Sequence, residues 1–240
     1  MQDILVAITS VIIFLIVYEV AMYVLAILGS TKLELLSLPD GIKGNVEGLI
    51  SFIQSIYGKP ITLRVWADIN RTEWISYNML LHKPVIIVNL ASLIELGKDG
   101  YAKVFLAHEV CHIKRKSSVK ALIISPLLIS LIIPVYMYAI KFTNILLTLA
   151  TLTCFAITIF ITLKFISAYD EFKTDECTAK ILGIDYVLKA YNYIASKYGD
   201  NKLKQRHYRL PFLITMLIKG ELPIEKRIEN ISKVRGTNLK

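Results

Sequence analysis

Three long apolar runs constrain the fold of this chain more than any other feature of its sequence. They cover residues 4–28, 119–140 and 145–166, and each exceeds the roughly 20 residues that a helix needs to cross a hydrocarbon core. The 240-residue chain is 55% hydrophobic with a mean hydropathy of +0.54, which is too apolar for an ordinary soluble domain. The sequence therefore predicts a mainly α integral membrane protein with three transmembrane helices.

The first run could be an uncleaved anchor or a cleaved signal peptide. It opens on Met1-Gln2-Asp3 without a basic residue, its apolar stretch is long for a signal core, and no Ala-x-Ala site follows it. We therefore expect an anchor. Glu19 lies inside this run, where an acid is costly and often functional. It could face a polar groove, but we expect it to snorkel and pair with a basic residue near the interface.

The distribution of Lys and Arg predicts the orientation in the membrane. Residues 29–118 hold 11 of them and residues 167–240 hold 14, whereas the link at 141–144 holds one and the extreme N-terminus none. The positive-inside rule then puts the N-terminus outside and both large segments in the cytoplasm of a multi-pass cell-membrane protein. The net charge of +9 suits loops beside an anionic lipid leaflet. No aromatic-interleaved basic stripe indicates a nucleic-acid partner.

The cysteines predict no disulfide framework. Cys154 lies within a span, while Cys111 and Cys177 lie on the side expected to be reducing. Cys111 points to a different helical face from its histidine neighbours, which favours packing over metal binding.

The first cytoplasmic segment, residues 30–118, is predicted to combine helices with a small sheet. Hydrophobic spacing indicates helices at 46–57 and 91–96 and a longer one from Asp99, and it indicates strands at 61–66, 73–81 and 84–88. The second segment, residues 167–240, is expected to be helical, with a helix through 165–182, another at 185–198 and a last charged one from Glu225. The two segments are therefore expected to form an α+β unit with a small sheet.

His108-Glu109-Val110-Cys111-His112 is the clearest chemical motif in the chain. On a helix, His108 and His112 stand one turn apart on one face, so both imidazoles can reach one metal ion. Glu109 lies beside the first ligand, where a general base is needed to take a proton from an attacking water. Two surface histidines on a helix are the plain alternative. The motif at these offsets favours a hydrolytic zinc site with one ion per chain.

The distance between this motif and the second span decides where the chemistry takes place. From His112 to Val119 is seven residues, or about 10 Å at helical rise, and nothing in the sequence ends the helix between them. Lys114, Arg115 and Lys116 belong at the headgroup level. The motif is thus expected just above the cytoplasmic surface, which argues against an intramembrane-cutting protease.

A catalytic zinc needs a third protein ligand, and Glu171 is the best candidate. It follows the third span at the depth expected for the zinc helix, and Asp175 shares its helical face. Glu171 can bind metal while Asp175 accepts the spare N–H of a ligating histidine. The alternative is that Glu171 and Asp175 are simply solvated acids, since Asp170 and Glu176 lie in the same helix and charged helix faces are common. Because Glu171 and the zinc motif are expected at the same membrane depth, we favour Glu171 as a metal ligand.

These motifs resemble the HtpX-type family of membrane zinc metallopeptidases, which are related to the CAAX prenyl proteases. The resemblance rests on the motif at 108–112, on Glu-x-x-x-Asp at 171–175, and on Leu-Pro-Ile-Glu-Lys-Arg-Ile-Glu at 222–229. It implies a zincin-like catalytic domain with zinc at His108, His112 and Glu171 and a general base at Glu109. It also implies that Asp175 accepts a hydrogen bond from a ligating histidine, and that Arg227 supports the site or faces the oxyanion. It also implies unfolded or damaged membrane proteins as substrates, in membrane protein quality control.

Two departures from the family mark this chain. A histidine usually precedes the proline of the last motif, and here Leu222 takes that place, so its role would pass to Arg227 or to His207. The family often has more spans than the three found here.

The predicted mechanism is zinc-dependent endopeptidase hydrolysis on an extended substrate backbone paired with an edge strand. The candidate strand lies just upstream of the zinc helix and comprises Val85, Ile86, Ile87 and Val88. A CAAX-type processing protease is a second hypothesis, although those relatives enclose a chamber with more spans. A non-proteolytic zinc-binding membrane scaffold is a third, which the intact Glu109 disfavours. The oligomeric state stays open.

Overall fold

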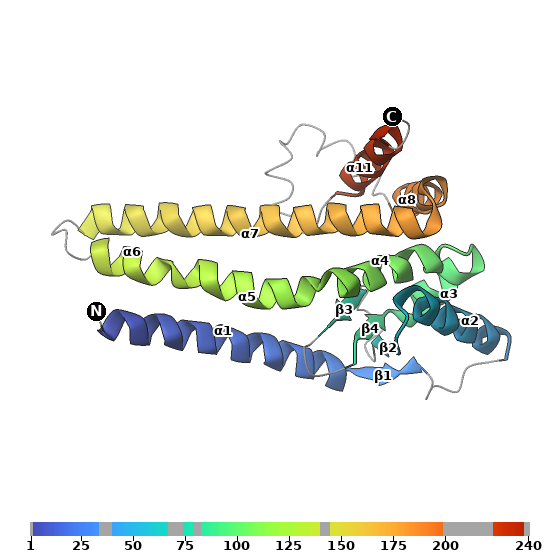
Figure 1. Ribbon diagram of the computed structural model, residues 1–240, viewed down its shortest axis with the longest axis horizontal. Coiled ribbons are helices and arrows are strands. Elements are labelled where there is room, and N and C mark those ends of the chain that lie inside the picture. The colour runs from blue at the N-terminus through green and yellow to red at the C-terminus, as the bar shows by residue number, and fades with distance from the viewer. Residues whose placement is uncertain are drawn as a thin grey trace.

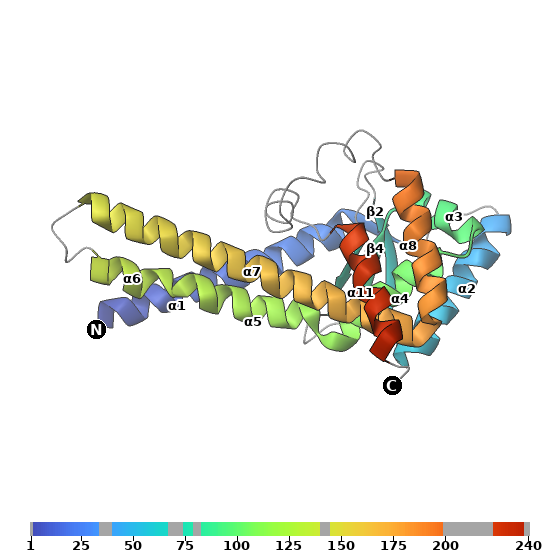
Figure 2. The same cartoon turned by 90° about the horizontal axis from the view of Figure 1, so that it is seen from above.

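Long helices lying side by side form a rod, and a head of shorter helices and a sheet lies at one end of it (Figures 1 and 2). The computed structural model describes residues 2–33, 40–66, 74–78, 83–139, 145–198 and 223–237. The rod contains helices α1 (Gln2–Leu28), α5 (Ser117–Ser130), α6 (Ile132–Ala139) and the first part of α7 (Ile145–Leu182).

The rod confirms the prediction of three membrane-spanning helices. Three helical stretches are long and apolar enough to cross a membrane, namely Ile8–Leu28, Ser117–Tyr136 and Ile145–Leu182. Their large apolar side chains point outward, as Leu28 and Leu146 show with 76% exposure each. Such surfaces suit lipid rather than water. The second span is two helices, with Pro126 inside α5 and a break at Leu131 before α6.

A four-stranded mixed sheet lies in the head. In sequence order the strands are β1 (Ser30–Lys32), β2 (Thr62–Trp66), β3 (Ile75–Tyr77) and β4 (Val85–Val88), and in space their order is β1-β2-β4-β3. β2 and β4 are parallel, while the two outer pairs are antiparallel. β1 had no counterpart in the sequence prediction.

The expectation that β4 is an edge strand is wrong. β4 pairs with β2 on one side and with β3 on the other, and all four residues Val85, Ile86, Ile87 and Val88 are buried. An uninterrupted β-branched run is typical of a strand covered on both faces, and such strands occupy the middle of a sheet. Among the described residues, the edges of the sheet are β1 and β3.

Helices cover both faces of the sheet. Helices α2 (Asp40–Tyr57), α3 (Leu90–Lys98) and α4 (Ala102–Arg115) pack on one face, with Ile53, Leu93 and Leu106 almost fully buried. The end of α1 covers the other face, where Ala26 packs with Trp66 and Ile87. The sheet thereby holds α4 firmly against the end of the membrane rod.

Helix α4 ends abruptly before the second span, contrary to the expectation of a continuous helix. Lys116 adopts a left-handed conformation, with φ 57° and ψ 39°, and its N–H caps the carbonyls of His112 and Ile113. A non-glycine residue in this region costs roughly 1–2 kcal/mol. The bend redirects the chain into α5 and turns Ser117 back toward His112.

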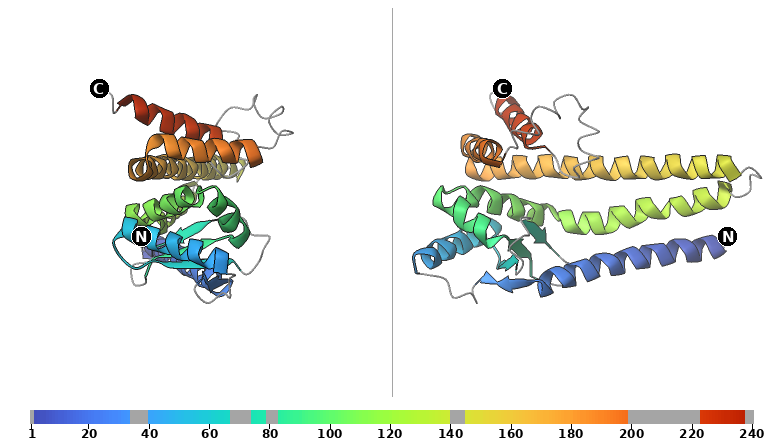
Figure 3. Two further views of the ribbon diagram at one scale, coloured as in Figure 1. Left: turned by 90° about the vertical axis from the view of Figure 1, so that its right-hand side faces the viewer. Right: turned by 180° about the vertical axis from the view of Figure 1, so that it is seen from behind.

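Two C-terminal helices complete the head. Helices α8 (Ile184–Tyr198) and α11 (Ile224–Thr237) lie on the side of α7 away from the sheet (Figure 3). Val187, Ala190, Tyr191 and Ile231 form a buried cluster that also includes Val104 of α4. Gly183 ends α7 with φ 88°, a conformation suited to glycine, as the sequence predicts. The polar half of α7 is therefore clamped between α4 and α11.

Candidate metal centre

Helix α4 brings the two motif histidines together on a buried face. His108 is 5% exposed, and its ring centroid lies 4.7 Å from that of His112. The two Nε2 atoms are 3.1 Å apart. This arrangement follows from the four-residue spacing, which puts both side chains on the face of α4 that packs against α7. Two imidazole nitrogens thus point to one spot.

Glu171 of α7 supplies the third group at that spot. Its Oε2 lies 3.2 Å from His108 Nε2, and its Oε1 lies 3.1 Å from His112 Nε2. Ligand atoms of His108, His112 and Glu171 all lie within 4.8 Å of one another, close enough to share one metal ion. Two imidazoles and one carboxylate match a hydrolytic metal site that keeps an open position. The residues present therefore fit the predicted ion.

The candidate base Glu109 lies next to the first ligand in α4. It is 8% exposed, so its carboxylate is largely removed from bulk water. Glu109 also stabilises the charged form of the His112 imidazole. It does not belong to the cluster of three ligand atoms. Because Glu109 is not one of the three candidate ligands, its carboxylate stays available for the predicted role of general base.

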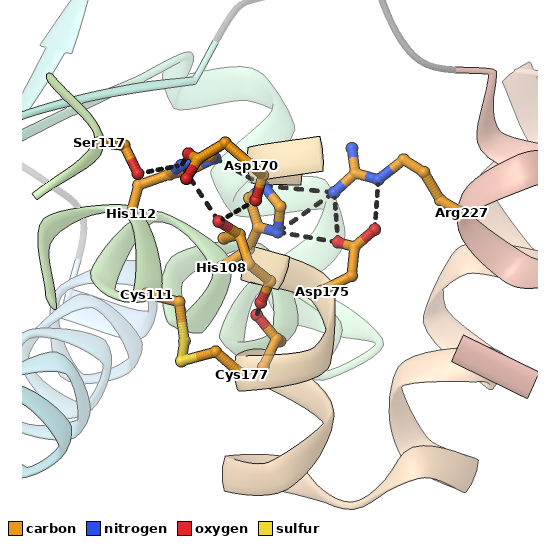
Figure 4. Close-up of a disulfide and its surroundings, with 10 residues drawn as sticks. His108, Cys111, His112, Ser117, Asp170, Asp175, Cys177 and Arg227 are labelled. Atoms are coloured by element: carbon orange, nitrogen blue, oxygen red, sulfur yellow. Dashed lines mark hydrogen bonds and ion pairs between the residues drawn. A yellow bond between two sulfur atoms is a disulfide. The ribbon is translucent and has the colours of Figure 1, made fainter. Parts of the chain in front are cut away.

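Asp175 and Arg227 form the support of His108 (Figure 4). Asp175 is completely buried, and its Oδ1 lies 3.0 Å from His108 Nδ1. Arg227 of α11 donates to both carboxylate oxygens of Asp175, at 3.0 Å from Nε and 2.7 Å from a terminal nitrogen. The same terminal nitrogen lies 3.1 Å from His108 Nδ1 and donates to Tyr191 Oη at 2.7 Å.

Tyr191 of α8 is a site residue that the sequence did not single out. Its hydroxyl donates to Asp175 Oδ1 at 2.6 Å, and the Arg227 guanidinium lies 4.9 Å from its ring centroid. The amphipathic pattern of α8 indicated only a buried aromatic residue. The buried charges of Asp175 and Arg227 are thus paired and hydrogen-bonded, as buried charges must be.

Asp170 is a second site residue that the sequence did not single out. Its Oδ2 lies 3.2 Å from His112 Nδ1, and its Oδ1 accepts a hydrogen bond of 2.8 Å from Arg115. The hydroxyls of Ser117 and Thr174 also lie beside His112 Nδ1, at 3.2 and 3.3 Å. The four-residue spacing from Asp170 to Thr174 could have indicated that they share one face of α7.

The carboxylates control the protonation of both imidazoles. Burial opposes the charged form of His112, but hydrogen bonds to Asp170 and Glu171 outweigh it and raise the pKa to about 10. Burial and the Arg227 guanidinium oppose the charged form of His108, yet contacts with Asp175 and Glu171 still raise its pKa. Protons and a metal ion therefore compete for the same nitrogen atoms.

A disulfide joins the two metal-site helices, which corrects the expectation that these cysteines stay unpaired. Cys111 of α4 bonds to Cys177 of α7, with their Cα atoms 6.0 Å apart (Figure 4). The bond shows that the side of α4 that carries Cys111 packs on α7, as does the side that carries the histidines, and Cys111 is not one of the three candidate ligands. The pairing could not be predicted from the sequence because it depends on which faces of α4 and α7 meet.

Some sequence expectations fall outside the described residues. These are Leu222, in the position of the family's histidine, and His207. Helix α1 includes Glu19, whose side chain is likewise outside the description. Pro223 is described, and its carbonyl accepts from the backbone N–H groups of Lys226 and Arg227 at the start of α11.

Comparison with known proteins agrees with this geometry. The profile of peptidase family M48 matches residues 77–234. No curated protein matches the chain at a significant level. Among solved structures, the crystal structure of S. mikatae Ste24p is similar, with a TM-score of 0.53 and 15% sequence identity. That likeness covers 96% of this chain and 62% of the Ste24p chain, and at this identity it concerns the fold alone.

The family match extends over well over half of the chain. It begins at the last residue of β3 and includes α4, the polar end of α7 and most of α11, so it contains every side chain of the metal cluster and its supports. It also confirms the resemblance to the HtpX-type membrane metallopeptidases. The chain belongs to peptidase family M48.

Proposed function

We propose that this protein is a membrane-anchored, zinc-dependent endopeptidase. The observation that carries the proposal is the convergence of His108, His112 and Glu171 within 4.8 Å, with Glu109 beside the first of them. A solely structural metal site needs no carboxylate base, whereas a hydrolytic one does. Family M48 membership and the three apolar helices are consistent with the same function.

The residues divide the chemistry between them. His108, His112 and Glu171 would hold a zinc ion, and that ion would supply the Lewis acidity that polarises a peptide carbonyl and acidifies a bound water. Glu109 accepts the proton of the attacking water and delivers it to the departing amine. Imidazole and carboxylate ligands in this motif favour zinc over other divalent ions.

Arg227 is proposed to support the site. Its guanidinium is bound to Asp175 and Tyr191 and lies against His108, which fixes the orientation of that ring. The same group lies 3.6 Å from Glu171 Oε2. Of the two roles that the family resemblance implies, these contacts favour the supporting one over an oxyanion-facing one.

The substrate backbone is proposed to pair with β3. This strand is an edge of the described sheet and lies against the metal-site helix. Ser118 Oγ donates to Ser76 O at 3.2 Å, and Asn78 Nδ2 donates to Ile113 O at 3.0 Å. An extended peptide added there would be held by main-chain hydrogen bonds, which read little sequence. That tolerance suits unfolded or damaged membrane proteins as substrates.

Metal removal tests the proposed activity. Purified protein in detergent should cleave an unfolded, casein-like substrate, lose that cleavage after chelation, and regain it with one equivalent of zinc. Elemental analysis should find one zinc per chain in the active form. Cleavage that persists in protein shown to be metal-free would contradict the proposal, and bound zinc without cleavage of any substrate would favour a scaffold.

A CAAX-type processing role is the second candidate, because the HtpX-type family that the motifs resemble is related to the CAAX prenyl proteases. Those relatives enclose a chamber with more spans than the three candidate spans of this chain, which weakens the case. Comparing cleavage of a prenylated C-terminal peptide with cleavage of the casein-like substrate separates the two. A marked preference for the prenylated peptide would favour the processing role.

We further propose that the metal centre faces the cytoplasm. The basic residues of the head support this orientation through the positive-inside rule. A disulfide is uncommon in a reducing compartment, but Cys111 is fully buried and Cys177 is partly buried, which limits the access of soluble reductants to the bond.

Cysteine labelling tests the orientation. Ser196 is exposed on α8, so Ser196→Cys in a Cys154→Ser background should react with an impermeant maleimide only after cells are permeabilised. Thr143→Cys, in the link between the second and third spans, is the matched control and should react in intact cells. Labelling of Ser196→Cys in intact cells would reverse the orientation.

A further inference from the structure

The two ligating histidines are held in the same way, although only one support was expected. Each ring directs Nε2 toward Glu171 and Nδ1 toward an aspartate. For His108 that aspartate is Asp175, at 3.0 Å, and for His112 it is Asp170, at 3.2 Å. An imidazole that binds metal through one nitrogen needs its other N–H bonded, because this bond fixes both tautomer and orientation.

Asp170 is itself held in place by the helix that carries His112. Its Oδ1 accepts from Arg115 at 2.8 Å, which leaves Oδ2 for the imidazole. Arg115 lies three residues after His112 on α4. The Asp170 carboxylate of α7 therefore contacts the last turn of α4 at two side chains, His112 and Arg115. The side chains of Asp170 and Arg115 are 20% and 25% exposed, which makes this a largely desolvated pair.

Three oxygen atoms surround His112 Nδ1, and Asp170 is the strongest acceptor among them. Thr174 Oγ1 uses its proton on the backbone carbonyl of Asp170, and Ser117 Oγ is a neutral hydroxyl. An ionised carboxylate makes hydrogen bonds roughly twice as strong as a neutral acceptor does. The N–H of His112 is therefore directed to Asp170, with Ser117 beside them (Figure 4). Thr174 Oγ1 lies 3.3 Å from the same Nδ1.

Asp170 does not belong to the metal cluster itself. Its carboxylate lies on the Nδ1 side of His112, and the two nitrogens of an imidazole ring point away from each other. An ion bound at Nε2, beside His108 and Glu171, therefore lies across the ring from Asp170. The alternative view, in which Asp170 serves only to tie α7 to α4 through Arg115, makes a different prediction for metal binding.

We propose that Asp170 is the positioning residue of His112, the counterpart of Asp175 at His108. It keeps the proton on Nδ1, so that the Nε2 lone pair faces the metal, and Arg115 keeps the carboxylate in place. The inference rests on the proposed metal site. A supporting group of this kind contributes about 10- to 100-fold to metal affinity.

The test measures zinc dissociation constants by chelator competition in the full-length, detergent-purified protein. Asp170→Ala should weaken zinc binding about 10- to 100-fold, whereas Asp170→Asn, whose amide oxygen can still accept the N–H, should weaken it less. Arg115→Gln breaks the ion pair but leaves the contact with His112, so its effect should also be smaller. In the cobalt-substituted protein, the visible absorption band should shift in Asp170→Ala.

Glu176→Gln is the matched control, because Glu176 lies on α7 and pairs with Lys173 rather than with a histidine. It should bind zinc like the wild type. Two results would overturn the proposal: a wild-type zinc affinity in Asp170→Ala, or an equal loss of zinc affinity in Arg115→Gln and Asp170→Ala. Either would indicate that Asp170 serves only to hold α7 against α4. Either result leaves chelator-sensitive cleavage by the wild type untouched, whereas a wild type that binds no zinc would refute the proposed function instead.

Discussion

Replacement of Glu109 by Gln is expected to reduce peptide cleavage by about 10²- to 10⁴-fold while leaving the metal content unchanged. The amide keeps the volume and the neighbours of the carboxylate but cannot take a proton at neutral pH. Glu109 lies outside the cluster of His108, His112 and Glu171, so zinc should still bind. The initial rate on an unfolded protein substrate and the zinc content of the same preparation are the two measurements.

The matched control for this variant is Glu47→Gln. Glu47 is exposed on α2, on a different element from the metal ligands, so its conversion to an amide should not change the rate. A Glu109→Gln protein that cleaves at the wild-type rate would remove Glu109 from the mechanism. A variant that loses its zinc would show instead that Glu109 helps to hold the ion.

Replacement of Glu171 by Ala is expected to abolish both zinc binding and cleavage. Glu171 is the one carboxylate of the cluster, and its two oxygens lie within 3.2 Å of both Nε2 atoms. Removing it leaves the two imidazoles and the residues that contact them from behind, namely Asp170, Asp175 and Arg227. We expect zinc affinity to fall by more than about 100-fold, which exceeds the effect of losing a supporting group. Isothermal titration with zinc measures this directly.

The result for Glu171 separates a ligand from a nearby solvated acid. Glu176→Gln, one turn further along α7, is again the control and should retain one zinc per chain. If Glu171→Ala bound zinc as tightly as the wild type, the third ligand would have to be another residue. A melting curve of the metal-free variant shows whether the loss reflects the missing ligand or a failure to fold.

Features set by local pattern could be predicted from the sequence. The three apolar runs, the helix of the zinc motif and the glycine that ends α7 follow from hydrophobic length, four-residue spacing and backbone freedom. The structure brings Glu171 to the histidines, as its expected depth in the membrane indicated. Depth carries this information because a spanning helix has a fixed rise per residue.

Features set by contacts between distant segments could not be predicted. The interior position of β4 depends on β2 and β3 pairing with its two sides. The apolar run at 85–88 predicts that the strand is buried, but it does not predict which strands lie beside it. The disulfide and the contact of Asp170 with His112 depend on how α7 is rotated against α4. The end of α4 could not be predicted either, because its left-handed residue is Lys116, whereas glycine or asparagine usually marks such a helix end.

The division of the metal cluster between two helices has a consequence for how the protein is made. His108 and His112 precede the membrane hairpin of α5, α6 and α7, whereas Glu171 follows it. A nascent chain therefore holds only an incomplete ligand set until the hairpin has inserted and its second arm has returned to the head. For the proposed metalloprotease, the complete set of ligands would therefore exist only after membrane insertion, and a chain stalled before that step would lack Glu171 at the site.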